Sequence, residues 1–336
     1  MRTVFLGSDP IALPLLDWLA DGEGRAHARL AAIYTQPDRP VGRGQKVRPN
    51  AIKTWALARG LPVFQPEKLT PDVRAGRAAL APDLALVMAY GHILRDDFIA
   101  TPRLGTLNLH ASLLPAWRGA SPIQTAIAGG ERETGVSLMR IVRQLDAGPV
   151  ADVERVAIAP LDTALDIEQK LAAACVPLLA RALPRLRDGA LVFVPQDDAR
   201  ATHCRRLVKT DGALDFHAPA ATLAARVNGL YPWPACSVEI NGQPIKFAQA
   251  EALPGEAATP PTMPDSRAPA PGEVLPSAPG TLHIATGAGI LRVHLLQRPG
   301  GKILPAPDFL RGFPIPPGTI LPSTAMPPLA VGAPLR

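Results

Sequence analysis

Cysteine is scarce in this sequence. The 336 residues contain three cysteines, Cys175, Cys204 and Cys236, and they are widely separated. An odd number of scattered cysteines provides neither a disulfide framework nor the closely spaced ligands of a metal site. We therefore expect no metal, no disulfide and a reducing compartment, the cytoplasm.

Long apolar runs are also missing. No stretch approaches the roughly 20 consecutive apolar residues that a membrane-spanning helix needs. The first ten residues, MRTVFLGSDP, lack the apolar core of a secretory signal. Hydrophobic residues still make up 47% of the chain, which is ample for packed cores, and the length allows two domains. We expect a folded protein without a membrane partner.

The glycine pattern of a dinucleotide site is absent as well. Residues 3–7 read as a buried strand, 11–20 as a helix and 30–34 as a second strand. This alternation predicts an α/β fold with a doubly wound, mostly parallel sheet. The first turn contains Gly7 but no Gly-x-Gly-x-x-Gly, so NAD is not predicted.

Further periodic segments extend this pattern along the first half of the chain. A continuous apolar run at 84–89 is typical of a central parallel strand. The helical pattern at 166–186 contains Pro177, which predicts a kink or break there. The remaining expected elements are helices at 51–59 and 121–128 and strands at 61–66 and 134–141.

The last third of the chain carries a different signal. Residues 238–247, with an Asn-Gly turn, and residues 281–295 read as two β-hairpins, which predict a small β-barrel. We expect a first domain at 1–190, a linker at 191–208, the barrel at 209–320 and a tail at 321–336. The proline-rich stretch 254–279 indicates an enlarged loop between barrel strands.

The segment 105–124, GTLNLHASLLPAWRGASPIQ, carries the strongest chemical signal. Its alternation over 106–110 predicts a strand with Asn108 and His110 on one face at the carboxyl end, where parallel sheets bind ligands. An amide there can donate to an oxyanion, and an imidazole can transfer a proton near neutral pH. Asn and His at strand ends also serve as ordinary capping and turn residues.

The segment 35–53 is strongly basic. Between residues 38 and 53 one acid, Asp38, faces five basic residues: Arg39, Arg43, Lys46, Arg48 and Lys53. Its prolines and glycines predict no regular structure. Such a loop can pair with phosphates, and the net charge of +6 suits a nucleic-acid partner. From charge alone, a solvated surface loop explains the pattern equally well.

Three short motifs together resemble the folate-dependent formyltransferases. They are NLH at 108–110, SLLP at 112–115 and QLDAG at 144–148. The resemblance implies that Asn108 stabilises the oxyanion, that His110 moves the proton and that Asp146 orients His110. It also implies a folate pocket formed by Ser112, Leu113, Leu114, Pro115, Ala89, Tyr90 and Gly91. That the barrel expected at 209–320 is OB-like is implied only by this resemblance. Taken alone, Asp146 is an ordinary turn residue, and His92 is a packing or pocket-wall residue.

The basic loop indicates which members of this family the chain resembles most. QPDRP at 36–40 and GRG at 42–44 are similar to the insertion of those family members that act on methionyl-tRNA. The resemblance implies a monomer that transfers formyl from 10-formyltetrahydrofolate to the α-amine of initiator methionyl-tRNA, with tRNA contacts from Arg39, Arg43, Lys46 and Arg48. Two alternatives stay open: a formyltransferase acting on an amino sugar or a glycinamide nucleotide, and a non-catalytic RNA-binding scaffold.

Overall fold

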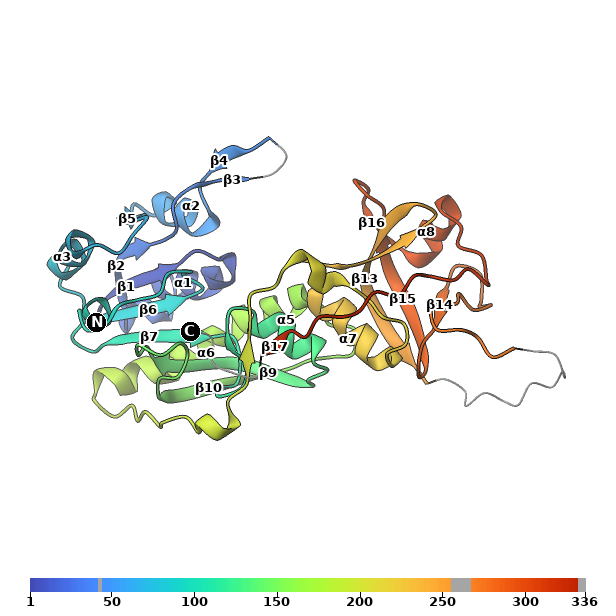
Figure 1. Cartoon of the computed structure of the whole chain (residues 1–336). Coiled ribbons are helices and arrows are strands. Elements are labelled where there is room, and N and C mark those ends of the chain that lie inside the picture. The colour runs from blue at the N-terminus through green and yellow to red at the C-terminus, as the bar shows by residue number, and fades with distance from the viewer. Residues whose placement is uncertain (42–43, 255–266, 332–336) are drawn as a thin grey trace.

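The structure is a computed structural model that describes residues 1–41, 44–254 and 267–331. Figure 1 shows two lobes, an α/β domain followed by a β domain, connected by an extended segment. None of the helices within the described ranges is both long enough and apolar enough to span a lipid bilayer.

A seven-stranded sheet forms the centre of the first domain. Its strand order is β10-β9-β7-β6-β1-β2-β5. Five neighbouring strands are parallel, and β9 and β10 add an antiparallel edge. The mostly parallel sheet predicted from the sequence is thereby confirmed. The strands are β1 (Arg2–Gly7), β2 (Arg29–Tyr34), β5 (Val63–Phe64), β6 (Leu84–Met88), β7 (Thr106–His110), β9 (Glu133–Arg140) and β10 (Val150–Ala157).

Helices cover both faces of this sheet. Because side chains alternate along a strand, Phe5 packs in one apolar cluster with α1 and α6, while Val4 and Leu6 pack in another cluster on the opposite face. The helices of the domain are α1 (Leu13–Ala20), α2 (Ala51–Ala58), α3 (Pro71–Ala79), α4 (Asp96–Ile99), α5 (Pro122–Ala128) and α6 (Ala164–Arg187).

The break expected at Pro177 does not occur. Helix α6 runs continuously over 24 residues with Pro177 and Pro184 inside it. A proline in a helix interior costs about 3 kcal/mol. Eleven buried residues along α6, including Cys175, Leu178 and Leu179, offset this cost by packing against the sheet.

The basic segment contains a hairpin, so the prediction of irregular structure was wrong there. Strands β3 (Arg39–Val41) and β4 (Lys46–Arg48) pair antiparallel and project from the domain (Figure 1). Pro40 is tolerated because both strands of a two-stranded ribbon are edges, where a missing N–H breaks no central ladder. Arg43 lies outside the described residues.

The second domain is a curled antiparallel sheet, as the hairpin patterns predicted. Its order is β12-β13-β15-β14, with β16 paired to β15. At the first hairpin, Asn241 and Gly242 have φ values of 50° and 69°, the left-handed pair that a type I′ turn requires. The elements are α7 (Ala220–Leu230), β12 (Cys236–Ile240), β13 (Gln243–Leu253), β14 (Leu282–Ala285), β15 (Ile290–Gln297), β16 (Ile303–Pro305) and α8 (Ala306–Gly312).

A small third sheet ties distant parts of the chain together. Strand β11 (His203–Cys204), in the connecting segment, pairs with β8 (Arg118–Gly119) on one side and with β17 (Ala330–Val331) on the other. The loop after β7, the linker and the end of the described chain are therefore held side by side.

One buried charge in the first domain has no acidic partner among the residues that the structure describes. Arg77 of α3 is 0% exposed, and its guanidinium lies over the Phe98 ring and donates to the Phe98 carbonyl oxygen. Its Nε and Nη1 have no hydrogen-bond partner within the described ranges. Burial lowers the pKa of Arg77 to about 10. Burying a charge in this way costs free energy of folding.

Replacing Arg77 by Met should therefore stabilise the protein. We expect the free energy of unfolding of Arg77→Met to rise by about 1–3 kcal/mol in urea titrations, because an apolar chain removes the desolvation cost. Arg74→Met, on the same helix but with an exposed ion pair to Asp97, is the control and should change stability by less than about 1 kcal/mol. A destabilised Arg77→Met protein would contradict this account.

Candidate active site

Strand β7 presents Asn108 and His110 on the face opposite the main core. Leu107 and Leu109 belong to the apolar cluster under α1 and α6, so the alternating side chains point the other way. Asn108 is the one residue of β7 that is partly exposed, while His110 is 7% exposed. The amide is accessible to a ligand, and the imidazole lies behind it in a site largely shielded from water.

The His110 ring is held between two oxygen atoms from different loops. Its Nε2 lies 3.0 Å from the Trp117 carbonyl oxygen, and its Nδ1 lies 3.7 Å from Asp146 Oδ2. A carbonyl oxygen only accepts, so Nε2 carries a proton and Nδ1 faces the carboxylate. The same Oδ2 accepts from the Gly119 backbone N–H at 2.9 Å. The structure thus brings His110 and Asp146 together, and Asn108, two residues before His110, lies on the same face of β7.

The loop after β7 uses Ser112 internally. Ser112 is 0% exposed, and its hydroxyl donates to the Ala116 carbonyl oxygen at 2.6 Å. Ser137 of β9 closes the loop by donating to the Ser112 carbonyl and accepting from the Leu114 N–H. Leu113, Leu114 and Pro115 remain partly exposed. The segment therefore offers a ligand an apolar wall, while the Ser112 hydroxyl shapes the loop.

The expected folate residues that follow β6 lie at the same end of the sheet as Asn108 and His110. Ala89 and Gly91 have φ values of 49° and 81° and are exposed, whereas the Tyr90 side chain is buried. Ser8 and Gln36 donate to the carbonyl oxygens of Ala89 and Tyr90 and fix the turn. Since β6 and β7 are parallel neighbours, the exposed residues Ala89 and Gly91 lie beside the carboxyl end of β7, where Asn108 and His110 are located.

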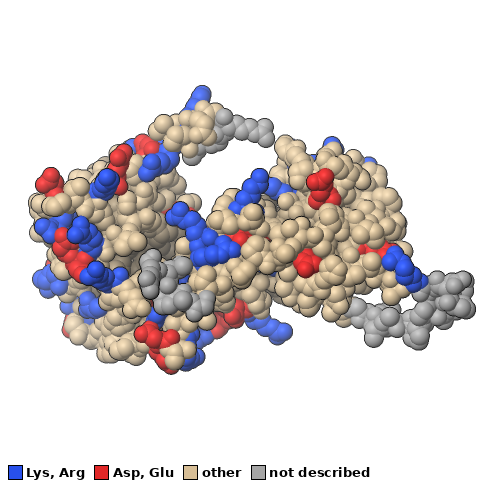
Figure 2. All heavy atoms as spheres, viewed as in Figure 1, with Lys and Arg blue, Asp and Glu red and all other residues tan. Residues whose placement is uncertain are grey.

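The basic residues lie away from this trio, on the β3–β4 hairpin. Arg39 and Arg48 are directly opposite each other, an arrangement of like charges that is destabilising without an anion. At the base of the hairpin, Lys53 pairs with Asp38 at 2.6 Å and holds the pKa of that carboxyl below its usual range. Figure 2 shows a hollow between the hairpin and the second domain, with Lys and Arg side chains gathered along it.

Sequence reasoning missed two polar residues that bear on the site. Arg118 is 1% exposed, and Gln196, from the connecting segment, donates to the carbonyl oxygens of Asp146 and Gly148. A charged residue next to Gly119 gave no local signal, because its partners lie 78 and 80 positions further along the chain. Only the folded chain shows these contacts.

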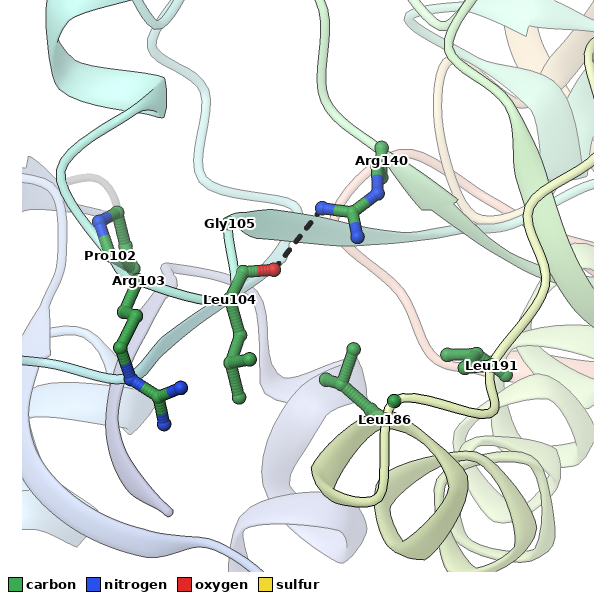
Figure 3. Close-up of a pocket in the computed structure, with 8 residues that line it drawn as sticks. Pro102, Arg103, Leu104, Gly105, Arg140, Leu186 and Leu191 are labelled. Carbon is green, nitrogen blue, oxygen red and sulfur yellow. Dashed lines mark hydrogen bonds between the residues drawn. The ribbon is translucent and has the colours of Figure 1, made fainter.

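A cavity of about 310 Å³ lies elsewhere in the first domain (Figure 3). It is located at the amino end of β7, where Arg140 Nη1 donates to the Leu104 carbonyl oxygen at 3.1 Å. None of the expected catalytic, folate or tRNA residues lines it. Its lining residues are Pro102, Arg103, Leu104, Gly105, Arg140, Leu186, Gly189 and Leu191.

In the part of the chain that the structure describes, no three His, Cys, Asp or Glu side chains are grouped as potential metal ligands. The candidate site itself consists of an amide, an imidazole, one carboxylate and exposed main chain. This set can polarise a carbonyl group and move a proton, which are the requirements of acyl-type transfer.

Comparisons with known proteins agree with this chemistry. A family model described as formyl transferase matches residues 1–183, and a second, described as its C-terminal domain, matches residues 206–314. The methionyl-tRNA formyltransferase of Cereibacter sphaeroides strain KD131 is 39% identical over 95% of this chain and 98% of that protein. The enzyme of the same name from Pseudomonas putida strain GB-1 is 40% identical, covering 92% and 94%.

A solved structure shares the fold. The N-formyltransferase of Helicobacter canadensis, in complex with folinic acid and dTDP-3-aminofucose, superposes with a TM-score of 0.62. The match covers 89% of this chain and 100% of that one at 15% identity. At this identity the likeness establishes the architecture of the chain.

The three thiols should be unreactive in the folded protein. Burial raises the pKa of Cys204, beside the site, to about 11, and the pKa values of Cys175 and Cys236 to about 12. At pH 8 only about one thiol in a thousand or fewer is then a thiolate, the reactive form. We expect no labelling by a disulfide reagent at pH 8 and labelling of all three cysteines in urea. Rapid labelling of native Cys204 would show that the site is more open than the structure indicates.

Proposed function

The chain belongs to the formyl transferase family, and from this premise we propose that it transfers a formyl group from 10-formyltetrahydrofolate to the α-amine of initiator methionyl-tRNA. The product is formylmethionyl-tRNA, which starts translation. One observation carries the proposal: Asn108, His110 and Asp146 converge at the end of β7 in a chain about 40% identical to methionyl-tRNA formyltransferases.

The proposed reaction is an attack of the uncharged amine on the formyl carbon. A free α-amine titrates near pH 7.7–8.0, roughly, so deprotonation needs little driving force. The new C–N bond leaves charge on the formyl oxygen, which the exposed Asn108 amide stabilises by donating a hydrogen bond. Breaking the bond to folate N10 then releases the formylated amine. No metal is needed for these steps.

His110 and Asp146 manage the proton in this proposal. The amine loses one proton and folate N10 gains one, so a group that takes and returns a proton completes the balance. His110 performs this transfer at Nδ1, because its Nε2 already donates to the Trp117 carbonyl oxygen. Asp146, on the Nδ1 side of the ring, stabilises the protonated imidazole and orients it.

The folate binds at the carboxyl ends of β6 and β7. Exposed main chain at Ala89 and Gly91 can hydrogen-bond a flat heterocycle, and the partly exposed Leu113, Leu114 and Pro115 can pack against it. The related Helicobacter protein was crystallised with folinic acid, a formylated folate. This supports a folate co-substrate here.

The tRNA is bound by the β3–β4 hairpin and the hollow beside it. The opposed Arg39 and Arg48, together with Lys46, are neutralised by phosphates of the acceptor arm. The second domain borders the same hollow (Figure 2). We infer that it contacts the tRNA as well. We infer that the protein acts as a monomer in the cytoplasm, where translation starts.

An amino-sugar substrate is the second candidate, because the Helicobacter structure holds dTDP-3-aminofucose. Its 15% identity, against about 40% for the tRNA enzymes, favours the tRNA. The deciding assay compares formyl transfer to charged initiator tRNA, free methionine and an amino-sugar nucleotide. Transfer to the sugar alone would replace the proposed substrate, and transfer to none would favour a non-catalytic scaffold.

Removing the oxyanion donor should slow the reaction strongly. We expect Asn108→Ala to lower kcat by about a hundredfold to a thousandfold while the fold stays intact, because the amide acts mainly in the transition state. Single-turnover transfer to charged tRNA measures this rate. Asn241→Gly, at a distant hairpin turn, is the matched control and should keep the wild-type rate. A near-normal rate in Asn108→Ala would refute the assignment.

The hairpin should control tRNA affinity but not folate affinity. We expect the double variant Lys46→Ala/Arg48→Ala to lower kcat/KM for tRNA by about tenfold or more and to reduce its dependence on salt. The KM for folate should stay unchanged. Arg25→Ala, a surface change elsewhere in the first domain, serves as control. Equal losses in both proteins would mean that only overall charge matters.

A further inference from the structure

The segment after α6 crosses the candidate site before it reaches the second domain. Val194 exchanges two backbone hydrogen bonds with Val150 at the start of β10, at 2.9 and 2.8 Å. This pairing fixes the segment two residues before Gln196. The position of the Gln196 side chain is therefore set by the sheet rather than by a free loop.

The Gln196 amide has four hydrogen bonds. Its Nε2 donates to the carbonyl oxygens of Asp146 at 2.8 Å and of Gly148 at 2.7 Å. Its Oε1 accepts from Arg118 Nε at 3.0 Å and from Arg118 Nη2 at 2.8 Å. The amide orientation is unambiguous, because the reverse would place NH₂ against a guanidinium and oxygen against two carbonyls.

These bonds join the two loops that hold the His110 ring. One loop contains Asp146, whose carboxylate faces Nδ1, and the other contains Trp117, whose carbonyl oxygen faces Nε2. Arg118 follows Trp117 directly and is buried, so its charge requires acceptors. Gln196 Oε1 accepts two of the Arg118 hydrogen bonds, and the Gln196 side chain contacts both loops at once.

We propose that Gln196 is a positioning residue for formyl transfer, which fixes the Asp146 carboxylate relative to His110 by clamping the 146–148 loop to Arg118. This proposal rests on the proposed function. Gln196 touches none of the reacting groups of that mechanism and acts through Asp146.

The backbone of Asp146 shows why a clamp is needed. Asp146 has a φ of 50°, a left-handed conformation that a non-glycine residue keeps only when its surroundings enforce it. On the far side of the loop, Gly148 is pressed against β9, where an added Cβ would lie 1.9 Å from the Arg140 carbonyl oxygen. Gln196 holds the near side. Without it, two carbonyl groups and Arg118 lose partners and the carboxylate can shift.

Two substitutions distinguish the contact of Gln196 with the 146–148 loop from its contact with Arg118. Gln196→Met removes every hydrogen bond at similar volume. Gln196→Glu keeps an acceptor for Arg118 but sets a carboxylate oxygen against the carbonyls of Asp146 and Gly148. Both variants lose the hydrogen bonds to the carbonyl oxygens of Asp146 and Gly148, and these bonds position the Asp146 carboxylate. Both should therefore lower kcat by about tenfold to a hundredfold, the scale of a 1 Å misplacement. The KM values for folate and tRNA should stay close to wild type.

The outcome for Gln196→Glu decides between two roles. Wild-type kcat in Gln196→Glu, with loss in Gln196→Met, would overturn the proposal, because holding Arg118 alone would then suffice. Gln169→Met, at an exposed position of α6 in the first domain, is the control and should keep full activity, since it lies outside the candidate site. Equal rises in KM and losses in kcat would likewise indicate general damage and overturn the proposal.

A double-mutant cycle tests whether Gln196 acts through Asp146. In an Asp146→Asn background, Gln196→Met should reduce kcat by less than about twofold, because the carboxylate that it positions is already gone. Multiplicative losses would show an independent role and contradict the proposal.

Hydrogen exchange provides a readout that does not depend on any substrate. In Gln196→Met the amide of Gly119, which donates to Asp146 Oδ2, should exchange at least about tenfold faster than in wild type, while β1 and β6 keep their protection. Unchanged exchange at Gly119 overturns the clamp even if the enzyme assay fails. Faster exchange in a protein that formylates no acceptor supports the clamp and refutes the proposed function alone.

Discussion

The candidate site depends on the hydrogen bonds that the buried guanidinium of Arg118 donates to Gln196 and Asp198. Burying a charge costs free energy unless it is paired. Arg118 is 1% exposed, and its partners, Gln196 and Asp198, both come from the segment after α6. This requirement draws the segment across the end of β7. Beyond it, Thr202 hydrogen-bonds the backbone N–H groups of Trp117 and Arg118 and places the Trp117 carbonyl beside His110.

The connecting segment is therefore part of the candidate active site as well as the link between domains. Its strand β11 lies between β8 and β17, so the active-site loop is bonded through it to the end of the described chain. In the proposed function the second domain binds tRNA, whose amine must reach the trio at the end of β7. A continuous hydrogen-bonded connection keeps these two parts of the reaction in register.

On strand β7 one face packs in the core and the other carries the candidate chemistry. On β7, Leu107 and Leu109 pack under α1 and α6, while Asn108 and His110 face the site. The β3–β4 hairpin contributes little to the packed core, because the residues of β4 are exposed. It also places Arg39 directly opposite Arg48. Such repulsion is tolerable in a surface ribbon, and an anionic ligand would relieve it. The same chain thus contains a rigid reaction centre and a basic arm suited to a large polyanion.

The sequence alone determined the parallel sheet, the hairpins of the second domain and the trio as candidates, because alternation, turn residues and short motifs are local signals. It missed the β3–β4 hairpin and allowed a break at Pro177, where strand pairing and burial of α6 outweigh local propensity. Only the tertiary structure decided the 3.7 Å approach of Asp146 to His110 and the roles of Arg118 and Gln196. Those contacts join residues 36 to 80 positions apart, and contacts over such separations leave no periodic trace in the chain.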